Sequence, residues 1–141
     1  MTAKTILLER IYDDQHRQGY RVLVDRLWPR GVTKERAGLD EWCKVLAPSP
    51  ALRTWFGHKP ELWEEFRKRY GHELEGLHHE AHALLQRAGH AHLVLVYGAR
   101  DTEHTHALVL KDYLQAISPQ EDEPIEMASP VCYAAEFDMN K

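Results

Sequence analysis

The sequence predicts one small α/β domain: an open sheet, at least partly parallel, flanked by helices. Two apolar runs, residues 20–27 and 92–97, have the continuous hydrophobicity of strands that are buried on both faces. The connection between them is long enough for a helical crossover, which makes the two strands parallel. The 141 residues, 43% of them hydrophobic, are sufficient for one globular core.

The N-terminal part is predicted to form two strands. Residues 4–12 give the first strand, and the polar residues 13–19 give the turn that follows. Residues 20–27 give the second strand. It ends at Trp28-Pro29, because proline cannot donate a hydrogen bond to the sheet and restricts the residue before it.

The middle of the chain is predicted to be mainly helical. Residues 33–46 give a mixed helical signal, and a short helix begins at Ser49, a capping residue followed by proline. The longest element is a helix over residues 60–89, whose regular geometry can relax at Gly71 or Gly76. Apolar residues at spacings of three and four form its buried face: Trp63, Phe66, Tyr70, Leu74, Leu77, Ala81 and Leu84.

The C-terminal part supplies a third strand at residues 92–97 and a helix over residues 103–117, capped by Thr102. The predicted domain therefore spans residues 1–117, and residues 118–141 form a C-terminal tail. Its acidic start is predicted to be an exposed linker. Its apolar segment, Val131–Phe137, is predicted to dock on its own domain or on a second copy, which would make a homodimer.

Composition excludes several classes of protein. A net charge of −4 does not favour duplex nucleic acid as a partner. Cys43 and Cys132 form no CxxC motif, so neither a disulfide scaffold nor a zinc ribbon is predicted, and Cys43 is interpreted as a buried structural cysteine. No apolar run approaches the roughly 20 residues of a membrane span, and no signal peptide is recognisable. We therefore expect a cytoplasmic protein with no membrane partner.

Charged residues lie where the second and third strands end. Asp25 and Arg26 close one apolar run, Arg30 follows in the loop, and Arg100 and Asp101 follow the other run. Ligands bind outside the carboxyl ends of parallel strands, where the next helix also directs its N–H groups. We expect a pocket for a phosphorylated or otherwise anionic small molecule, such as a nucleotide. The alternative is a structural network in which these carboxylates pair with the arginines.

Roles follow from residue chemistry. Arginine suits phosphate or carboxylate oxygens, and histidine or a carboxylate can transfer a proton. Asp101 and His106 are the catalytic candidates. Because residues two apart point differently on a helix, at most one of His104 and His106 is expected to point inward. His106 is the expected one, as a packed side chain or as a general acid–base. The candidate ligand-binding residues are Arg26, Trp28, Arg30, Tyr97, Arg100 and His104.

Other motifs are weaker. His78 and His82 share a helix face, but without an HExxH motif or a third ligand they favour a solvated face over a metal site. The segment Trp55–His58 is predicted to lie on a loop between helices, where it can form the wall of a pocket that stacks a ring. No Walker loop, GxGxxG or GxSxG is present, so the sequence leaves the identity of any cofactor unknown.

Together these motifs resemble the domain-of-unknown-function 488 family, YeaO-like branch. The resemblance covers residues 4–117, leaves the tail outside the family core, and implies a small α/β domain in a bacterial or archaeal cytosolic protein, with a pocket at the motif residues. Where the family usually has asparagine between two histidines, this chain has Thr105. The motifs are Arg10-Ile-Tyr-Asp13, Leu23-Val-Asp-Arg-Leu-Trp-Pro-Arg-Gly31, Leu46-Ala-Pro-Ser49, Trp55-Phe-Gly-His58 and Val96-Tyr-Gly-Ala-Arg-Asp101, followed by His104 and His106.

Two functions therefore remain open. The first is an enzyme that acts on a phosphorylated small molecule or nucleotide, which agrees with links inferred between related families and nucleotide or nucleic-acid metabolism. The second is a non-catalytic module that senses such a ligand, or a protein partner, through the same pocket. A catalytic site needs a proton-transferring group close to the reacting atom, and a binding module does not.

Overall fold

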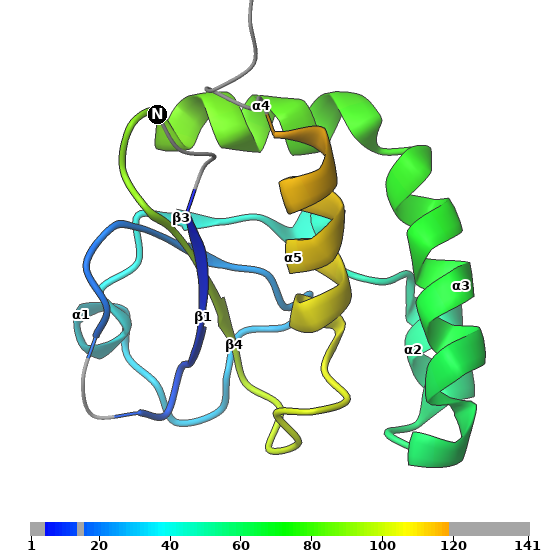
Figure 1. The fold of residues 1–141 in the computed structure, drawn as a ribbon. Helices are drawn as coiled ribbons and strands as arrows, with labels where there is room; N and C mark the ends of the chain where they lie inside the picture. The colour runs from blue at the N-terminus through cyan, green and yellow to red at the C-terminus, as the bar shows by residue number, and fades with distance from the viewer. Residues whose placement is uncertain (1–4, 14–15, 119–141) are drawn as a thin grey trace, which may run out of the picture.

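The chain folds around a parallel sheet (Figure 1). A computed structural model describes residues 5–13 and 16–118. Within these residues every strand pair is parallel, and the strand order is β1-β4-β2-β3. The predicted α/β class is confirmed, and so is the parallel pairing of the second and third predicted strands. The strands are β1 (Ile6–Arg10), β2 (Tyr20–Leu23), β3 (Glu41–Trp42) and β4 (Leu93–Tyr97).

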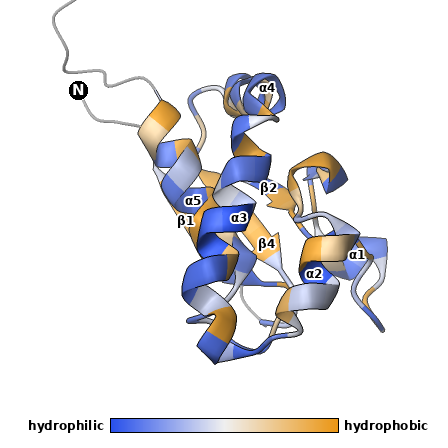
Figure 2. Cartoon of the chain, turned by 90° about the vertical axis from the view of Figure 1, so that its right-hand side faces the viewer, coloured by the Kyte–Doolittle hydropathy of each residue, from blue (hydrophilic) through white to orange (hydrophobic). Residues whose placement is uncertain are grey.

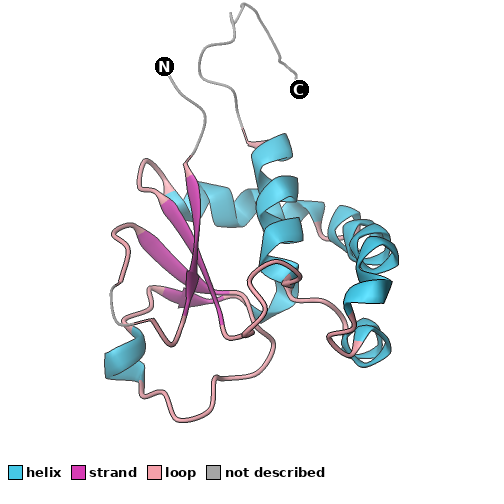
Figure 3. Cartoon of the chain, turned by 60° about the horizontal axis from the view of Figure 1, so that its bottom comes forward, coloured by secondary structure: helices cyan, strands magenta, loops and turns pink. Residues whose placement is uncertain are grey.

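Helices cover the two faces of the sheet unequally (Figure 3). On one face α5 packs against β1 and β4, and α3 packs on α5; the short α1 lies on the other face. No helix of the described residues is both long and apolar enough to cross a membrane. The helices of this part are α1 (Lys34–Ala37), α2 (Pro50–Phe56), α3 (Trp63–Glu75), α4 (His78–Ala88) and α5 (His106–Ile117).

Side chains of the sheet alternate between two cores. In β4, Leu93 and Leu95 face the larger core beneath the helices, whereas Val94 and Val96 face the smaller core beside α1. All residues of β4 are buried, and Figure 2 shows this hydrophobic strand behind the hydrophilic outer face of α3. Burial on both faces explains why these strands have continuous rather than alternating hydrophobicity.

The helix predicted over residues 60–89 is divided. A 3-10 turn, η2 (Pro60–Leu62), precedes α3, which has Gly76 as its C-cap. The chain leaves the helical conformation at the next residue, Leu77, which has φ −112° and ψ 26°. The following helix, α4, then crosses the top of the molecule in Figure 1 at a steep angle to α3. The break lies at the second of the two glycines that the sequence offered.

The apolar face predicted for this segment is confirmed. It is buried or partly buried along its whole length, whereas His78 is exposed. The His78 ring lies 4.5 Å from the His82 ring, and its Nδ1 atom is 3.1 Å from the Tyr113 hydroxyl. Among the described residues, no group of three or more His, Cys, Asp or Glu side chains could hold a metal ion.

The last helix begins later than predicted. It begins at His106 rather than at residue 103, because the Asp101 carboxylate accepts the backbone N–H groups two and three residues ahead and closes a turn. Thr105, not Thr102, is the N-cap, and its hydroxyl accepts a hydrogen bond from the first turn of α5. The predicted tail, apart from Ser118, lies outside the described residues.

Two earlier segments also differ from prediction. The mixed signal over residues 33–46 comes from three short elements, α1, β3 and the 3-10 turn η1 (Lys44–Leu46), rather than from one helix. The second strand ends at Leu23 instead of residue 27, although the Val24 N–H still donates to the Val96 carbonyl at 2.9 Å. The chain from Asp25 onward is thereby released to form the loop beyond the sheet.

The prediction that Cys43 is buried is confirmed, since only 4% of its surface is exposed. Burial raises the pKa of the Cys43 thiol, and the nearby Glu41 carboxylate raises it further. At pH 8 the thiolate fraction is therefore smaller in the folded chain than in an unfolded one.

We expect iodoacetamide to alkylate Cys43 at least roughly tenfold more slowly in the folded protein than in urea, because access and thiolate fraction both fall. The measurement uses a Cys132→Ser chain, in which Cys43 is the single thiol. Because the pKa of Cys43 is raised in the folded chain, the alkylation rate of the folded protein should level off at a higher pH than the rate in urea. Equal rates in the two states would contradict the buried position.

Candidate functional site

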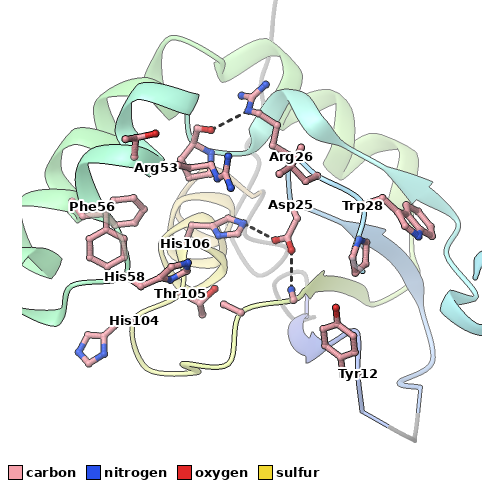
Figure 4. Close-up of a pocket in the computed structure, with 17 residues that line it drawn as sticks. Tyr12, Asp25, Arg26, Trp28, Arg53, Phe56, His58, His104, Thr105 and His106 are labelled. Carbon is pink, nitrogen blue, oxygen red and sulfur yellow. Dashed lines mark hydrogen bonds and ion pairs between the residues drawn. The ribbon is translucent and has the colours of Figure 1, made fainter. Parts of the chain in front are cut away.

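A cavity of about 450 Å³ opens at the carboxyl ends of the parallel strands (Figure 4). This is the sheet edge at which the charged strand ends are predicted to meet. Segments that follow β1, β2 and β4 line it, together with α2 and the beginning of α5. The lining residues are Tyr12, Asp25, Arg26, Leu27, Trp28, Pro29, Pro48, Arg53, Thr54, Phe56, His58, Phe66, Gly98, Ala99, His104, Thr105 and His106.

Asp25 connects three of these segments. Its Oδ2 atom accepts the Gly98 N–H at 2.9 Å, which joins the loops after β2 and β4. A Cβ atom at residue 98 would lie 3.1 Å from Oδ2, so glycine permits this close approach. The Oδ1 atom is buried, has no hydrogen bond within the described part of the chain, and lies 3.3 Å from His106 Nε2. Asp25 therefore positions its neighbours and does not present a free carboxylate to a ligand.

His106 is the first residue of α5. Its Nε2 atom lies 3.0 Å from the Val24 carbonyl oxygen as well as 3.3 Å from Asp25. Because both neighbours are acceptors, we assign the proton of the neutral ring to Nε2. The ring also contacts Tyr70 edge-on, with centroids 6.1 Å apart. His106 is thus fixed between strand, loop and core.

His104 also lines the cavity, and it is held by different partners. Its Nδ1 atom lies 2.8 Å from Asp101 Oδ2, and its ring contacts Trp63 edge-on at 5.4 Å. This contact with His104, together with backbone hydrogen bonds, lowers the pKa of Asp101. The expectation that one of the two histidines must face away is wrong, because His104 lies in a turn and not on the helix.

The catalytic candidates Asp101 and His106 do not form a pair. Asp101 is not among the lining residues and closes its own turn, whereas the carboxylate beside His106 is Asp25. The predicted alternative, pairing of these carboxylates with Arg26 and Arg100, is not observed either. Asp25 contacts Gly98 and His106 instead.

The predicted arginines separate into two groups. Arg26 lines the cavity, and its guanidinium donates to the Pro48 carbonyl at 3.2 Å. Arg30 and Arg100 are exposed and do not line the cavity, although each follows a lining residue in the chain. Tyr97 is buried in the larger core, where burial raises its pKa. Trp28 lines the cavity as predicted, and its Nε1–H donates to the Val32 carbonyl.

Arg53 lines the cavity without having been predicted, and His58 lines it as part of the segment that was predicted to form a pocket wall. Arg53 projects from α2, is exposed, and has no side-chain partner in the ranges 5–13 and 16–118. His58 has φ of +59°, a left-handed conformation that is uncommon outside glycine. The Trp55–His58 motif was the available signal: Phe56 and His58 do line the cavity, although Phe56 ends α2 and Trp55 lies outside. Nothing local in the sequence indicates Arg53.

Comparison with known proteins identifies the relatives of this chain. The uncharacterized protein YeaO of Escherichia coli (strain K12) is 42% identical over 113 residues, which cover 79% of this chain and 98% of that protein. Uncharacterized proteins of Mycobacterium bovis and Mycobacterium tuberculosis are 38% identical over 77% of this chain and 92% of theirs. No solved structure is a significant match.

A family model described as the inactive DUF488-N3 subclade matches residues 5–134. The match extends beyond residue 117, where the sequence resemblance was expected to end, and so includes part of the predicted tail. The family model and the identity to YeaO agree with each other. This chain therefore belongs to the DUF488 family, in its YeaO-like branch.

Proposed function

We propose that this protein is a binding module that holds an anionic small molecule in the cavity, a phosphorylated compound or nucleotide being the favoured class. The observation that carries the proposal is the charge of the lining. Among the described residues it contains the two guanidinium groups of Arg26 and Arg53 against the single carboxylate of Asp25, which already contacts Gly98 and His106. The two arginines are therefore not neutralised by carboxylates of the lining.

Arg53 is the principal anion ligand in this proposal. Its planar guanidinium can give two parallel hydrogen bonds to a phosphate or carboxylate, and it lies at the mouth without a described partner. Arg26 is partly engaged with backbone carbonyls and adds charge from a fixed position. The lining of the cavity carries a positive charge although the net charge of the whole chain is −4. The electrostatic attraction of an anion is therefore confined to the cavity.

The hydroxyl groups of the cavity support binding without turnover. The Tyr12 hydroxyl donates to the Arg30 carbonyl, the Thr105 hydroxyl caps α5, and the third hydroxyl of the lining belongs to Thr54. Within the described residues none of these three hydroxyls is hydrogen-bonded to an imidazole, and the lining includes no serine, cysteine or lysine. A nucleophile beside a base, which covalent catalysis requires, is thus not assembled there. The family description as an inactive subclade supports the same reading.

We expect Arg53→Ala to weaken the binding of inorganic phosphate about 10- to 100-fold, the usual worth of a hydrogen bond to a charged group. Isothermal titration calorimetry measures the affinity. Arg36→Ala is the matched control, because Arg36 is also exposed but lies in α1 on the other face of the sheet. Equal weakening in both variants, or no phosphate binding by the natural chain, would refute the proposed site.

One observation favours the enzymatic alternative: His106 lies beside a carboxylate, as a general acid–base would. Incubation with p-nitrophenyl phosphate separates the two functions. A binding module releases no nitrophenol above the solvent rate. Release that is lost in His106→Gln and retained in His78→Gln, an exposed histidine of α4, would establish an enzyme instead.

A further inference from the structure

Exposed apolar side chains gather at the mouth of the cavity. In the described part of the chain, three large hydrophobic residues are exposed: Tyr12 (37%), Leu27 (63%) and Val45 (44%). Single exposed apolar residues are ordinary on protein surfaces, but Tyr12 and Leu27 both line this one cavity. The apolar surface of these two side chains is not buried in the core of this domain and is accessible to a ligand in the cavity.

The Tyr12 ring is held in place by neighbours on several sides. Its hydroxyl donates to the Arg30 carbonyl at 3.0 Å, and the Arg10 guanidinium lies 5.6 Å from the ring centroid. Arg10 is itself fixed, because its Nε donates to the Ala99 carbonyl at 2.9 Å. The only polar atom of the tyrosine side chain is thus satisfied within the protein. The ring offers an orientated apolar surface that needs little further ordering on binding.

Other rings in the lining are fixed as well. Phe56 stacks on Phe66 with centroids 4.4 Å apart, and Trp28 packs edge-on against Trp42 at 5.3 Å. Figure 4 places Tyr12 and Trp28 on one side of Asp25 and the Arg53–His58 region on the other. Tyr12 and Trp28 therefore form an aromatic side of the cavity at the loops after β1 and β2, whereas the side at α2 combines Arg53 with Phe56.

We infer that the natural ligand is an aromatic anion: a planar ring that lies against Tyr12 and Leu27, joined to a phosphate or carboxylate that Arg53 binds. This inference rests on the proposed function, because it adds a ring-binding part, at Tyr12 and Leu27, to the cavity in which Arg53 binds the anion. Size agrees with it, since about 450 Å³ is typical of a small-molecule site and far exceeds a lone phosphate. The flat, fixed rings and interspersed polar groups suit a planar ring better than a flexible hydrocarbon chain.

The test compares the affinities of four probes by calorimetry: inorganic phosphate, phenyl phosphate, adenosine 5′-monophosphate and adenosine. Stacking of a ring on an aromatic side chain is worth about 5- to 100-fold in affinity. We expect phenyl phosphate or the monophosphate to bind more tightly than inorganic phosphate by a factor in this range. Adenosine should bind weakly, because it lacks the anion.

Two variants test where the ring of the ligand binds. Tyr12→Ala and Leu27→Ala should remove the preference for ring-bearing phosphates, and their affinity for inorganic phosphate should stay within about twofold of that of the natural chain. Leu27→Ala guards against misfolding, because this side chain is largely exposed and its loss should not change the melting temperature. Val45→Ala is the matched control, an exposed aliphatic residue that does not line this cavity.

The outcomes distinguish the two claims. If all phosphates bind equally and Arg53→Ala weakens each of them, the anion site stands and the aromatic inference is overturned. If adenosine binds as tightly as its monophosphate, the proposed anion site fails while the ring site stands. If none of the four probes binds, or if Val45→Ala changes the preference as much as Leu27→Ala does, the inference fails.

Discussion

Replacement of Arg21 by methionine should lower the free energy of unfolding by about 3–5 kcal/mol, the usual cost of removing one partner of a buried ion pair. Arg21 Nη1 contacts Glu9 Oε1 at 2.6 Å, and both side chains are almost fully buried. Arg21 also donates to the carbonyls of Ala37 and Gly38. The variant leaves the Glu9 carboxylate and these two carbonyls with fewer partners in the smaller core. Urea denaturation followed by circular dichroism measures the loss.

Arg67→Met is the control for this prediction. Arg67 pairs with Glu64 at 3.2 Å on the exposed side of α3, where an ion pair contributes at most about 0.5 kcal/mol. The double variant Glu9→Gln/Arg21→Met should recover part of the stability, because it removes the unpaired charge. If Arg21→Met unfolded at the same urea concentration as Arg67→Met, the buried pair would not stabilise the fold.

The second large effect is expected at Gly19, where substitution by alanine should cost about 3 kcal/mol. Gly19 has φ of +143°, which side chains disfavour, and a Cβ atom there would overlap the His92 carbonyl oxygen. That oxygen cannot simply move away, because it accepts the Tyr20 N–H at 2.7 Å where β2 begins beside β4. Thermal and urea unfolding should both show the loss.

Gly71→Ala should change the free energy of unfolding in the opposite direction in the same experiment. Gly71 lies inside α3, and a Cβ atom there would have no neighbour within 4 Å. Alanine at this position should stabilise the protein by about 0.5–1 kcal/mol, because it restricts the unfolded chain and favours the helix. If Gly19→Ala were as stable as the natural chain or as Gly71→Ala, the role assigned to the Gly19 backbone would be incorrect.

The positions of the main elements could be predicted because their signals are local. The continuous apolar run of β4 and the spaced apolar face of α3 and α4 each depend on residues that are close in sequence. The errors came from competition between local signals. Asp101 closes a turn where the sequence offered a helix start, and Gly76 breaks a helix whose apolar face continues beyond it.

The residue pattern alone was enough to predict that parallel strands end in charged loops, and hence at which end of the strands the cavity lies. Which side chains line the cavity depends on how the helices pack. Arg53 and His58 enter because α2 packs on α3, a contact between apolar faces that carries no information about the arginine. Arg30 and Arg100 stay outside because a side chain's direction depends on the turn that holds its backbone. Asp25 meets His106 because both lie at strand and helix ends that the parallel topology brings together, 81 positions apart in the chain.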